Sequence, residues 1–180
     1  MTIEQLQDQL PDYAKDIRLN LESVLSTGGA PGLDEKQIAL VALASAIASR
    51  YEPLVGAMAE FAAGHASAEE LNGARAAAAI MAMNNVYYRF VHSVDDDEYA
   101  TLRAGLRMNV MRNPCCDKVA FELASLAVSA VNGCAACMNS HEKTLRKHGL
   151  GAQAVQSAAR IAAVVHAAAV TLEQSMKDEN

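Results

Sequence analysis

The pattern of apolar and polar residues along the chain predicts helices and essentially no sheet. Long apolar stretches, rich in alanine, are bounded by residues that begin or end helices, and no segment sustains the alternation of a half-buried strand. Thr2 with Gln5, and Ser67 with Glu70, have the spacing of capping boxes, and Asp34 and Asp117 are predicted to cap the helices that follow them. The predicted helices span residues 2–10, 12–25, 34–49, 53–63, 67–90, 117–131, 134–149 and 151–175.

The second half of the chain repeats the helical plan of the first half. A shift of 83 residues places 43–47 (Leu-Ala-Ser-Ala-Ile) over 126–130 (Leu-Ala-Val-Ser-Ala). Self-similarity at a fixed offset is typical of one supersecondary unit used twice. We therefore predict a single all-α domain over residues 1–180, with a twofold internal repeat whose halves span about 34–90 and 117–175.

Composition adds an expectation about assembly and argues against one class of partner. Hydrophobic residues make up 52% of the chain, yet aromatic residues are only 4% and Trp is absent. Because alanine buries little apolar area per residue, we expect the helical core to be completed by association of identical chains. The net charge is −6 and the 15 Lys and Arg residues form no run. Nucleic acid is not an expected partner, since phosphate binding requires a basic stripe.

The ends and the apolar runs of the chain predict a cytoplasmic protein. The first residues lack the charged start and apolar core of a signal peptide. The longest apolar stretches, 76–83 and 161–172, are shorter than a membrane span, and His166 interrupts the second. No membrane association is expected. In the reducing cytosol, paired cysteines are more often catalytic or metal-binding than structural.

Two cysteines and a histidine occur together near the start of one predicted helix. Residues 133–141 read Gly-Cys-Ala-Ala-Cys-Met-Asn-Ser-His, so three positions separate Cys134 from Cys137 and four separate Cys137 from His141. Residues at these intervals share one face of a helix, where the two thiols and the imidazole can converge. His141 then lies near enough to accept the proton of Cys137.

The position of the pair at a helix start favours ionised thiols. Asn132 and Gly133 break the preceding helix, so the pair lies where unpaired backbone N–H groups and the helix dipole favour negative charge. A free cysteine titrates near ~8.5, whereas Cys-x-x-Cys thiols at helix N-termini titrate at roughly 3.5–7.5. Since only the thiolate is a nucleophile, this placement predicts a reactive pair.

Glu122 is the candidate partner of His141. It lies on the preceding predicted helix, fifteen positions before Cys137, and is the only Asp, Glu, Lys or Arg between Lys118 and Glu142. A carboxylate in such an apolar helix needs a partner, because burying it unpaired is costly. An antiparallel helix pair would bring its carboxylate against His141, orienting the ring and holding its proton.

Zinc binding is the main alternative to redox chemistry at this pair. A closed structural zinc site has four ligands, usually from two spaced pairs, whereas the remaining cysteines, Cys115 and Cys116, are adjacent. We therefore predict no metal ligand and interpret Cys115 and Cys116 as bystanders. A zinc-dependent interaction module and a purely structural pair of buried thiols stay as the less favoured interpretations.

The motif and several flanking segments point to one known family. They are Glu122 followed by eleven residues and then Cys-x-x-Cys, three residues and His; 10–17 (Leu-Pro-Asp-Tyr-Ala-Lys-Asp-Ile); 81–89 (Met-Ala-Met-Asn-Asn-Val-Tyr-Tyr-Arg); 105–109 (Gly-Leu-Arg-Met-Asn); and 128–134 (Val-Ser-Ala-Val-Asn-Gly-Cys). On these residues, which are spread over nearly the whole chain, the protein resembles the alkyl hydroperoxide reductase AhpD family, within the carboxymuconolactone decarboxylase-like superfamily.

The resemblance implies a fold, an assembly and an activity. It implies an all-helical subunit with an internal repeat, assembled as a homotrimer. It also implies an antioxidant enzyme that reduces small alkyl hydroperoxides and passes electrons from dihydrolipoyl groups to a partner peroxiredoxin, AhpC. The electron donor would be dihydrolipoamide or a lipoylated protein, and no cofactor would be bound.

The resemblance also implies a role for each residue of the motif. Cys137 would be the attacking thiol that becomes a sulfenic acid, and Cys134 the proton donor and the resolving thiol that closes a redox disulfide with it. His141 would act as base and Glu122 as the second member of the proton relay. Relatives can carry a His next to the second cysteine where this chain has Ala136, which leaves the tuning of thiol acidity in doubt but not the reaction.

Two other enzymatic functions remain as alternative interpretations of the sequence. A general protein disulfide reductase would use the same four residues. A decarboxylase, or another non-redox enzyme of the superfamily, is less favoured, because proton transfer on a lactone does not need two thiols.

Overall fold

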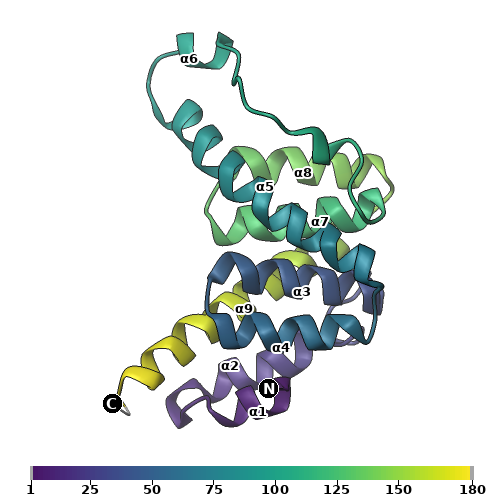
Figure 1. The fold of residues 1–180 in the computed structure, drawn as a ribbon, viewed down its shortest axis with the longest axis vertical. Helices are drawn as coiled ribbons and strands as arrows, with labels where there is room; N and C mark the ends of the chain where they lie inside the picture. Colours follow the sequence, from purple (N-terminus) through teal and green to yellow (C-terminus); the bar gives the residue numbers. More distant parts are fainter. Residues whose placement is uncertain (1, 179–180) are drawn as a thin grey trace.

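The computed structural model describes residues 2–178, and within them every regular element is a helix (Figure 1). The predicted all-α fold class is therefore confirmed. The elements are α1 (Ile3–Asp8), the 3₁₀ helix η1 (Asp12–Ala14), α2 (Lys15–Val24), α3 (Glu35–Ser49), α4 (Glu52–Ala63), α5 (Ala68–Ser93), α6 (Glu98–Thr101), the 3₁₀ helix η2 (Asn109–Met111), α7 (Lys118–Val131), α8 (Ala135–Lys147) and α9 (Ala152–Asp178).

The helix starts follow the capping residues that the sequence predicts. Thr2, Asp34 and Ser67 each accept a hydrogen bond from the backbone N–H three residues later, and the side chain of that later residue bonds back to the cap. These capping boxes satisfy backbone N–H groups that have no partner inside a helix. Asp117 caps α7 with a single bond of this kind, in which its carboxylate accepts from the backbone N–H of Ala120.

Two helices at the centre of the fold are buried on nearly every side. The buried residues of α3 run without interruption from Ile38 to Ala46, and those of α7 from Ala120 to Ser129. A helix that is apolar all round must be covered by others, and α3 indeed packs against α4, α5, α7 and α9. Alanines on these faces allow close approach. Through α7, this core carries the carboxylate and the turn that form the candidate site.

The helices of the two predicted repeat halves begin at nearly constant offsets. The helices α3, α4 and α5 start at residues 35, 52 and 68, and α7, α8 and α9 start at 118, 135 and 152, which gives offsets of 83, 83 and 84. These offsets match the shift read from the sequence. Equal spacing along the sequence does not show that the two halves have the same three-dimensional structure. The internal repeat therefore stays a prediction.

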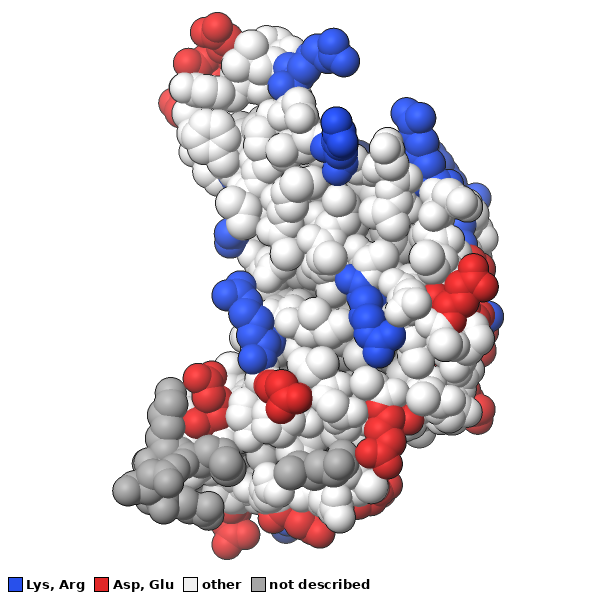
Figure 2. Space-filling model, viewed as in Figure 1, with Lys and Arg blue, Asp and Glu red and all other residues white. Residues whose placement is uncertain are grey.

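The segment between α5 and α7 projects from the helical body as an arm (Figure 1). The predicted helix ending at Phe90 continues to Ser93, and the acidic run from Asp95 leads into the short α6, so that acidic side chains lie at the tip of the arm (Figure 2). The arm then returns through η2 toward the start of α7, where Lys118 Nζ donates to the carbonyl oxygen of Met111 at 3.1 Å. This return brings Met111 back to the candidate site.

One apolar segment is longer than the sequence indicated. Residues 152–175 of α9 are long and apolar enough, by length and composition, to cross a membrane, whereas the uninterrupted run 161–172 is not. The expectation that every apolar stretch is too short is therefore corrected, because alanines and small polar residues extend the apolar helix. Half of this segment's apolar window is buried inside the fold, as in a core helix, and α9 packs against α2, α3 and α7.

Removing the cap of α3 is expected to lower the free energy of unfolding by about 1 kcal/mol. Asp34→Ala deletes the hydrogen bond of 2.8 Å from the Gln37 backbone to Asp34 Oδ1 and leaves that N–H group without its partner. Urea unfolding followed by circular dichroism would measure the loss. Glu22→Ala, an exposed mid-helix change in α2, is the control and should stay within about 0.5 kcal/mol of the parent. Equal midpoints for both variants would contradict the prediction.

Candidate active site

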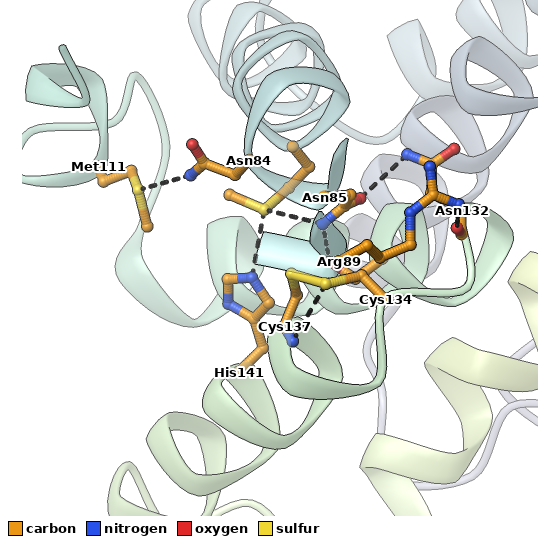
Figure 3. Close-up of a disulfide and its surroundings, with 10 residues drawn as sticks. Asn84, Asn85, Arg89, Met111, Asn132, Cys134, Cys137 and His141 are labelled. Atoms are coloured by element: carbon orange, nitrogen blue, oxygen red, sulfur yellow. Dashed lines mark hydrogen bonds between the residues drawn. A yellow bond between two sulfur atoms is a disulfide. The ribbon is translucent and has the colours of Figure 1, made fainter. Parts of the chain in front are cut away.

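The turn between α7 and α8 places both cysteines of the pair. The helix α7 ends at Val131, and Gly133 adopts a φ of +69°, a left-handed conformation that glycine tolerates without strain. Cys134 is then the N-cap of α8, with Cys137 inside the first turn. In the structure the two sulfurs are joined in a disulfide (Figure 3).

The sulfur of Cys134 faces the N-terminus of α8. It accepts a hydrogen bond of 3.3 Å from the backbone N–H of Cys137, in the way that an oxygen acceptor caps a helix. In the reduced protein, the same N–H group and the helix dipole favour negative charge on sulfur. The Cys134 backbone N–H donates to the Ser129 carbonyl at 2.9 Å, which ties the turn back to α7.

His141 and Glu122 form a buried pair behind the cysteines. The ring atom Nδ1 lies 2.6 Å from Glu122 Oε2, and only 5% of His141 and 4% of Glu122 are exposed. The other carboxylate oxygen pairs with Lys118 Nζ at 2.8 Å. Burial alone would raise the pKa of Glu122, but the hydrogen bonds from His141 and Lys118 outweigh it and hold that pKa below its usual value. Glu122 is therefore ionised at neutral pH.

The second ring nitrogen of His141 faces a methionine instead of a cysteine. Nε2 lies 3.3 Å from Met81 Sδ, and within residues 2–178 neither ring nitrogen is hydrogen-bonded to the sulfur of Cys134 or Cys137. His141 shares a face of α8 with the pair, as the spacing predicts, but is not hydrogen-bonded to either sulfur in the disulfide form. Any proton transfer between His141 and Cys137 therefore requires a bridging water or a small movement of the ring.

A cavity of about 330 Å³ opens beside the pair. Cys137, which is 7% exposed, and His141 lie on its wall, whereas Cys134 is completely buried. Only Cys137 of the two sulfurs is thus accessible from this cavity. The rest of its lining is mainly apolar and comes from α5, the arm and α8: Met81, Tyr88, Met108, Met111 and Ala136, with the polar side chains of Asn84, His92 and Ser140.

The remaining cysteines are both free thiols. Cys115 is exposed, and Cys116 is half-buried at the start of α7 with its sulfur near Gly73. Burial, with Asp117 and Cys115 beside it, raises the pKa of Cys116 to about 11 and keeps it a neutral thiol. Among the described residues, no group of three or more His, Cys, Asp or Glu side chains is placed to hold a metal ion.

Sequence reasoning missed Lys118 and Met81, which contact the predicted quartet, and Asn85, which bonds to Met81 and to the segment leading into Cys134. Lys118 lies four positions before Glu122 on the same helix, a spacing that predicts an ion pair. Met81 and Asn85 come from α5 and meet the site only through tertiary packing. Their one local signal is the spacing of four residues, which places both on the same face of α5.

Fold and site together define a class of protein: an all-helical subunit with a dithiol–disulfide pair at a helix N-terminus and a buried histidine–carboxylate pair beside it. The chain matches the model of the carboxymuconolactone decarboxylase family over residues 97–175. It is 53% identical over 173 residues to the alkyl hydroperoxide reductase AhpD of Frankia alni, covering 96% of this chain and 92% of that protein.

Two further relatives carry the same name. The alkyl hydroperoxide reductase AhpD of Rhizorhabdus wittichii is 53% identical over 169 residues, covering 94% of this chain and 96% of the relative. That of a Bradyrhizobium species is 49% identical over 173 residues, covering 96% and 94%. The chain therefore belongs to the alkyl hydroperoxide reductase AhpD family, and the family predicted from the sequence is confirmed.

Proposed function

We propose that this protein is an antioxidant alkyl hydroperoxide reductase that works through a dithiol–disulfide cycle at Cys134 and Cys137. The observation that carries the proposal is their disulfide at the end of a mainly apolar cavity, beside the ionised Glu122 and His141. Relatives named for this activity support it.

The oxidative half-reaction begins at Cys137, the sulfur that the cavity reaches. Its thiolate attacks the outer oxygen of ROOH, so the O–O bond breaks, Cys137 becomes a sulfenic acid and the alkoxide leaves as ROH after taking a proton. Cys134 then attacks the sulfenic sulfur, and a molecule of water leaves as the disulfide closes. The apolar wall of methionines and Tyr88 suits the alkyl part of the substrate.

His141 supplies and removes the protons of this cycle. Because Glu122 is an acceptor, Nδ1 keeps a hydrogen, and Nε2 is the nitrogen free to exchange a proton with Cys137 through one water. In the disulfide form Nε2 lies against the sulfur of Met81, which can only accept a hydrogen bond.

The reductive half-reaction uses an external dithiol and no bound cofactor. A dihydrolipoyl group, from dihydrolipoamide or a lipoylated protein, attacks the disulfide, passes through a mixed disulfide, and leaves as the cyclic lipoyl disulfide. Two electrons return the pair to thiols. The reduced pair would also pass these electrons by the same exchange to a partner peroxiredoxin of the AhpC type, its larger role in the cytoplasm.

We propose a homotrimer of single-domain subunits as the working assembly. Support comes from exposed apolar side chains on the end of α5 and on the arm, which association would cover: Val86, Phe90, Val94, Tyr99, Leu102 and Leu106. The molecular mass measured by sedimentation velocity would test the assembly, with a monomer of 19.1 kDa contradicting it.

A general protein disulfide reductase is supported less well by this geometry. Cys134 is fully buried and Cys137 is 7% exposed at the wall of a cavity, which suits a small peroxide, a lipoyl arm or one specific protein partner better than the disulfides of proteins in general. The description of the matching family names a decarboxylase, a reaction in which two thiols joined in a disulfide have no role.

Purified protein is expected to consume a small alkyl hydroperoxide when dihydrolipoamide, lipoamide dehydrogenase and NADH are supplied. NADH oxidation that depends on both peroxide and protein measures turnover, because each ROOH reduced returns one lipoamide disulfide to the dehydrogenase. Addition of a peroxiredoxin of the AhpC type should raise the rate further. No turnover with or without the peroxiredoxin would overturn the proposed function.

A further inference from the structure

A buried asparagine on α5 connects the elements that carry the candidate site. Asn85 is completely buried, and both ends of its amide are used (Figure 3). Nδ2 donates to Ser129 Oγ at 2.9 Å, and Oδ1 accepts from Asn132 Nδ2 at 2.9 Å. Both partners belong to the segment that ends α7 and leads into Cys134.

Ser129 and Asn132, the two residues bonded to Asn85, also help to hold the backbone around Gly133. Ser129 accepts the backbone N–H of Cys134 through its carbonyl group, at 2.9 Å. The carbonyl oxygen of Asn132 accepts from the Arg89 guanidinium at 2.9 Å, one helical turn beyond Asn85 on the same face of α5. The backbone on either side of Gly133 is therefore held against α5, not only by its own helix.

The same face of α5 also reaches the histidine. Met81 lies one turn before Asn85, its sulfur is 3.9 Å from Asn85 Nδ2, and it contacts His141 Nε2 at 3.3 Å. A single rigid helix thus sets the position of Cys134 and of His141 relative to each other. A buried amide without its partners would be costly, so this arrangement has few alternatives.

We propose that Asn85 is a positioning residue that holds Cys134 ready to attack the sulfenic acid of Cys137. The inference rests on the proposed peroxidase cycle. It adds the contact that makes the second step of that cycle, closure of the disulfide, fast. Condensation of Cys134–SH with Cys137–SOH forms the S–S bond and releases water, and its rate depends on the sulfurs staying close and aligned. Attack of Cys137 on the peroxide forms no bond to Cys134 and does not depend on how closely the two sulfurs are aligned.

Two variants and one matched control separate this role from general packing. Asn85→Leu keeps the volume and removes both hydrogen bonds, and Ser129→Ala removes one of them from the other side. Ser125→Ala is the control, since Ser125 lies one turn earlier on α7, is fully buried, and has a hydroxyl with no hydrogen-bond partner among the described residues. Reduced protein is mixed with one equivalent of cumene hydroperoxide and dimedone, and mass spectrometry measures the Cys137 adduct against the disulfide over time.

We expect the two variants to slow disulfide closure and to leave peroxide consumption unchanged. Asn85→Leu and Ser129→Ala should consume peroxide at the parent rate but close the disulfide about tenfold more slowly, leaving more dimedone adduct on Cys137. Ser125→Ala should match the parent. An adduct fraction equal to the parent in both variants, or a loss confined to peroxide consumption, overturns the role of Asn85.

A second measurement does not depend on peroxide chemistry. The disulfide of both variants, titrated against a buffer of reduced and oxidised dithiothreitol, should be about tenfold easier to reduce, because the thiols are less well aligned to pair. If the parent reduces no peroxide, the proposed function fails while this titration still decides the role of Asn85. If Asn85→Leu does not fold, the milder Ser129→Ala decides it, and a disulfide as stable as the parent's overturns the proposal.

Discussion

Replacement of Cys137 by serine is expected to abolish peroxide turnover, lowering the rate by about a thousandfold or more. Cys137 lies on the wall of the cavity, and a serine hydroxyl at this position stays protonated and is a poor nucleophile toward an O–O bond. The NADH-coupled assay with dihydrolipoamide measures the loss. Cys115→Ser is the matched control, because Cys115 is an exposed free thiol away from the pair and should leave the rate unchanged.

Replacement of Cys134 by serine should stop the cycle one step later, after the sulfenic acid has formed. Cys134→Ser retains the attacking thiol, so one equivalent of peroxide should be consumed and a sulfenic acid should accumulate on Cys137, visible as a single dimedone adduct. Sustained turnover then fails because no disulfide forms. Consumption of one equivalent of peroxide by Cys137→Ser, with a sulfenic acid accumulating on Cys134 instead, would show that the two roles are reversed.

Local signals in the sequence were sufficient for the helices and for much of the site. Capping residues such as Asp34 and Asp117 marked where helices begin, because their side chains satisfy the backbone N–H groups at that end. The spacing from Cys134 to His141 placed three side chains on one face of a helix, since that periodicity is fixed by helix geometry. The structure places all three on α8 or at its cap.

Features that depend on packing between distant segments could not be predicted in this way. The 2.6 Å contact between Glu122 and His141 was anticipated only because a lone carboxylate in an apolar helix requires a partner. Nothing local in Met81 or Asn85 distinguishes them from other residues of a long helix, since their contacts with α7 and α8 arise from how α5 crosses these helices. The apolar length of α9 was underestimated because an unbroken run is a stricter criterion than mean hydropathy.

Replacement of Glu122 by glutamine is expected to slow turnover about a hundredfold. Glutamine keeps the shape of the side chain, and its oxygen still accepts from His141 Nδ1, while Lys118, at the protein surface, turns toward solvent. Only the negative charge that stabilises a protonated ring is lost. The rising limb of the rate–pH profile should therefore move to higher pH. Glu142→Gln is the control, since Glu142 is half-buried on α8 and, among the described residues, forms its ion pair with Arg146, at 3.8 Å.

The same variant is expected to change how stability depends on pH. The pKa of Glu122 is lower in the folded protein than in the unfolded chain, where a glutamate titrates near ~4.3. Its ionised form therefore stabilises the fold fully above that value, and this contribution is lost as the pH falls toward the folded pKa. Urea unfolding between neutral pH and about pH 3 should show a smaller loss of stability on acidification for Glu122→Gln than for the parent. Parallel curves would mean that His141 and Lys118 do not hold the carboxylate ionised.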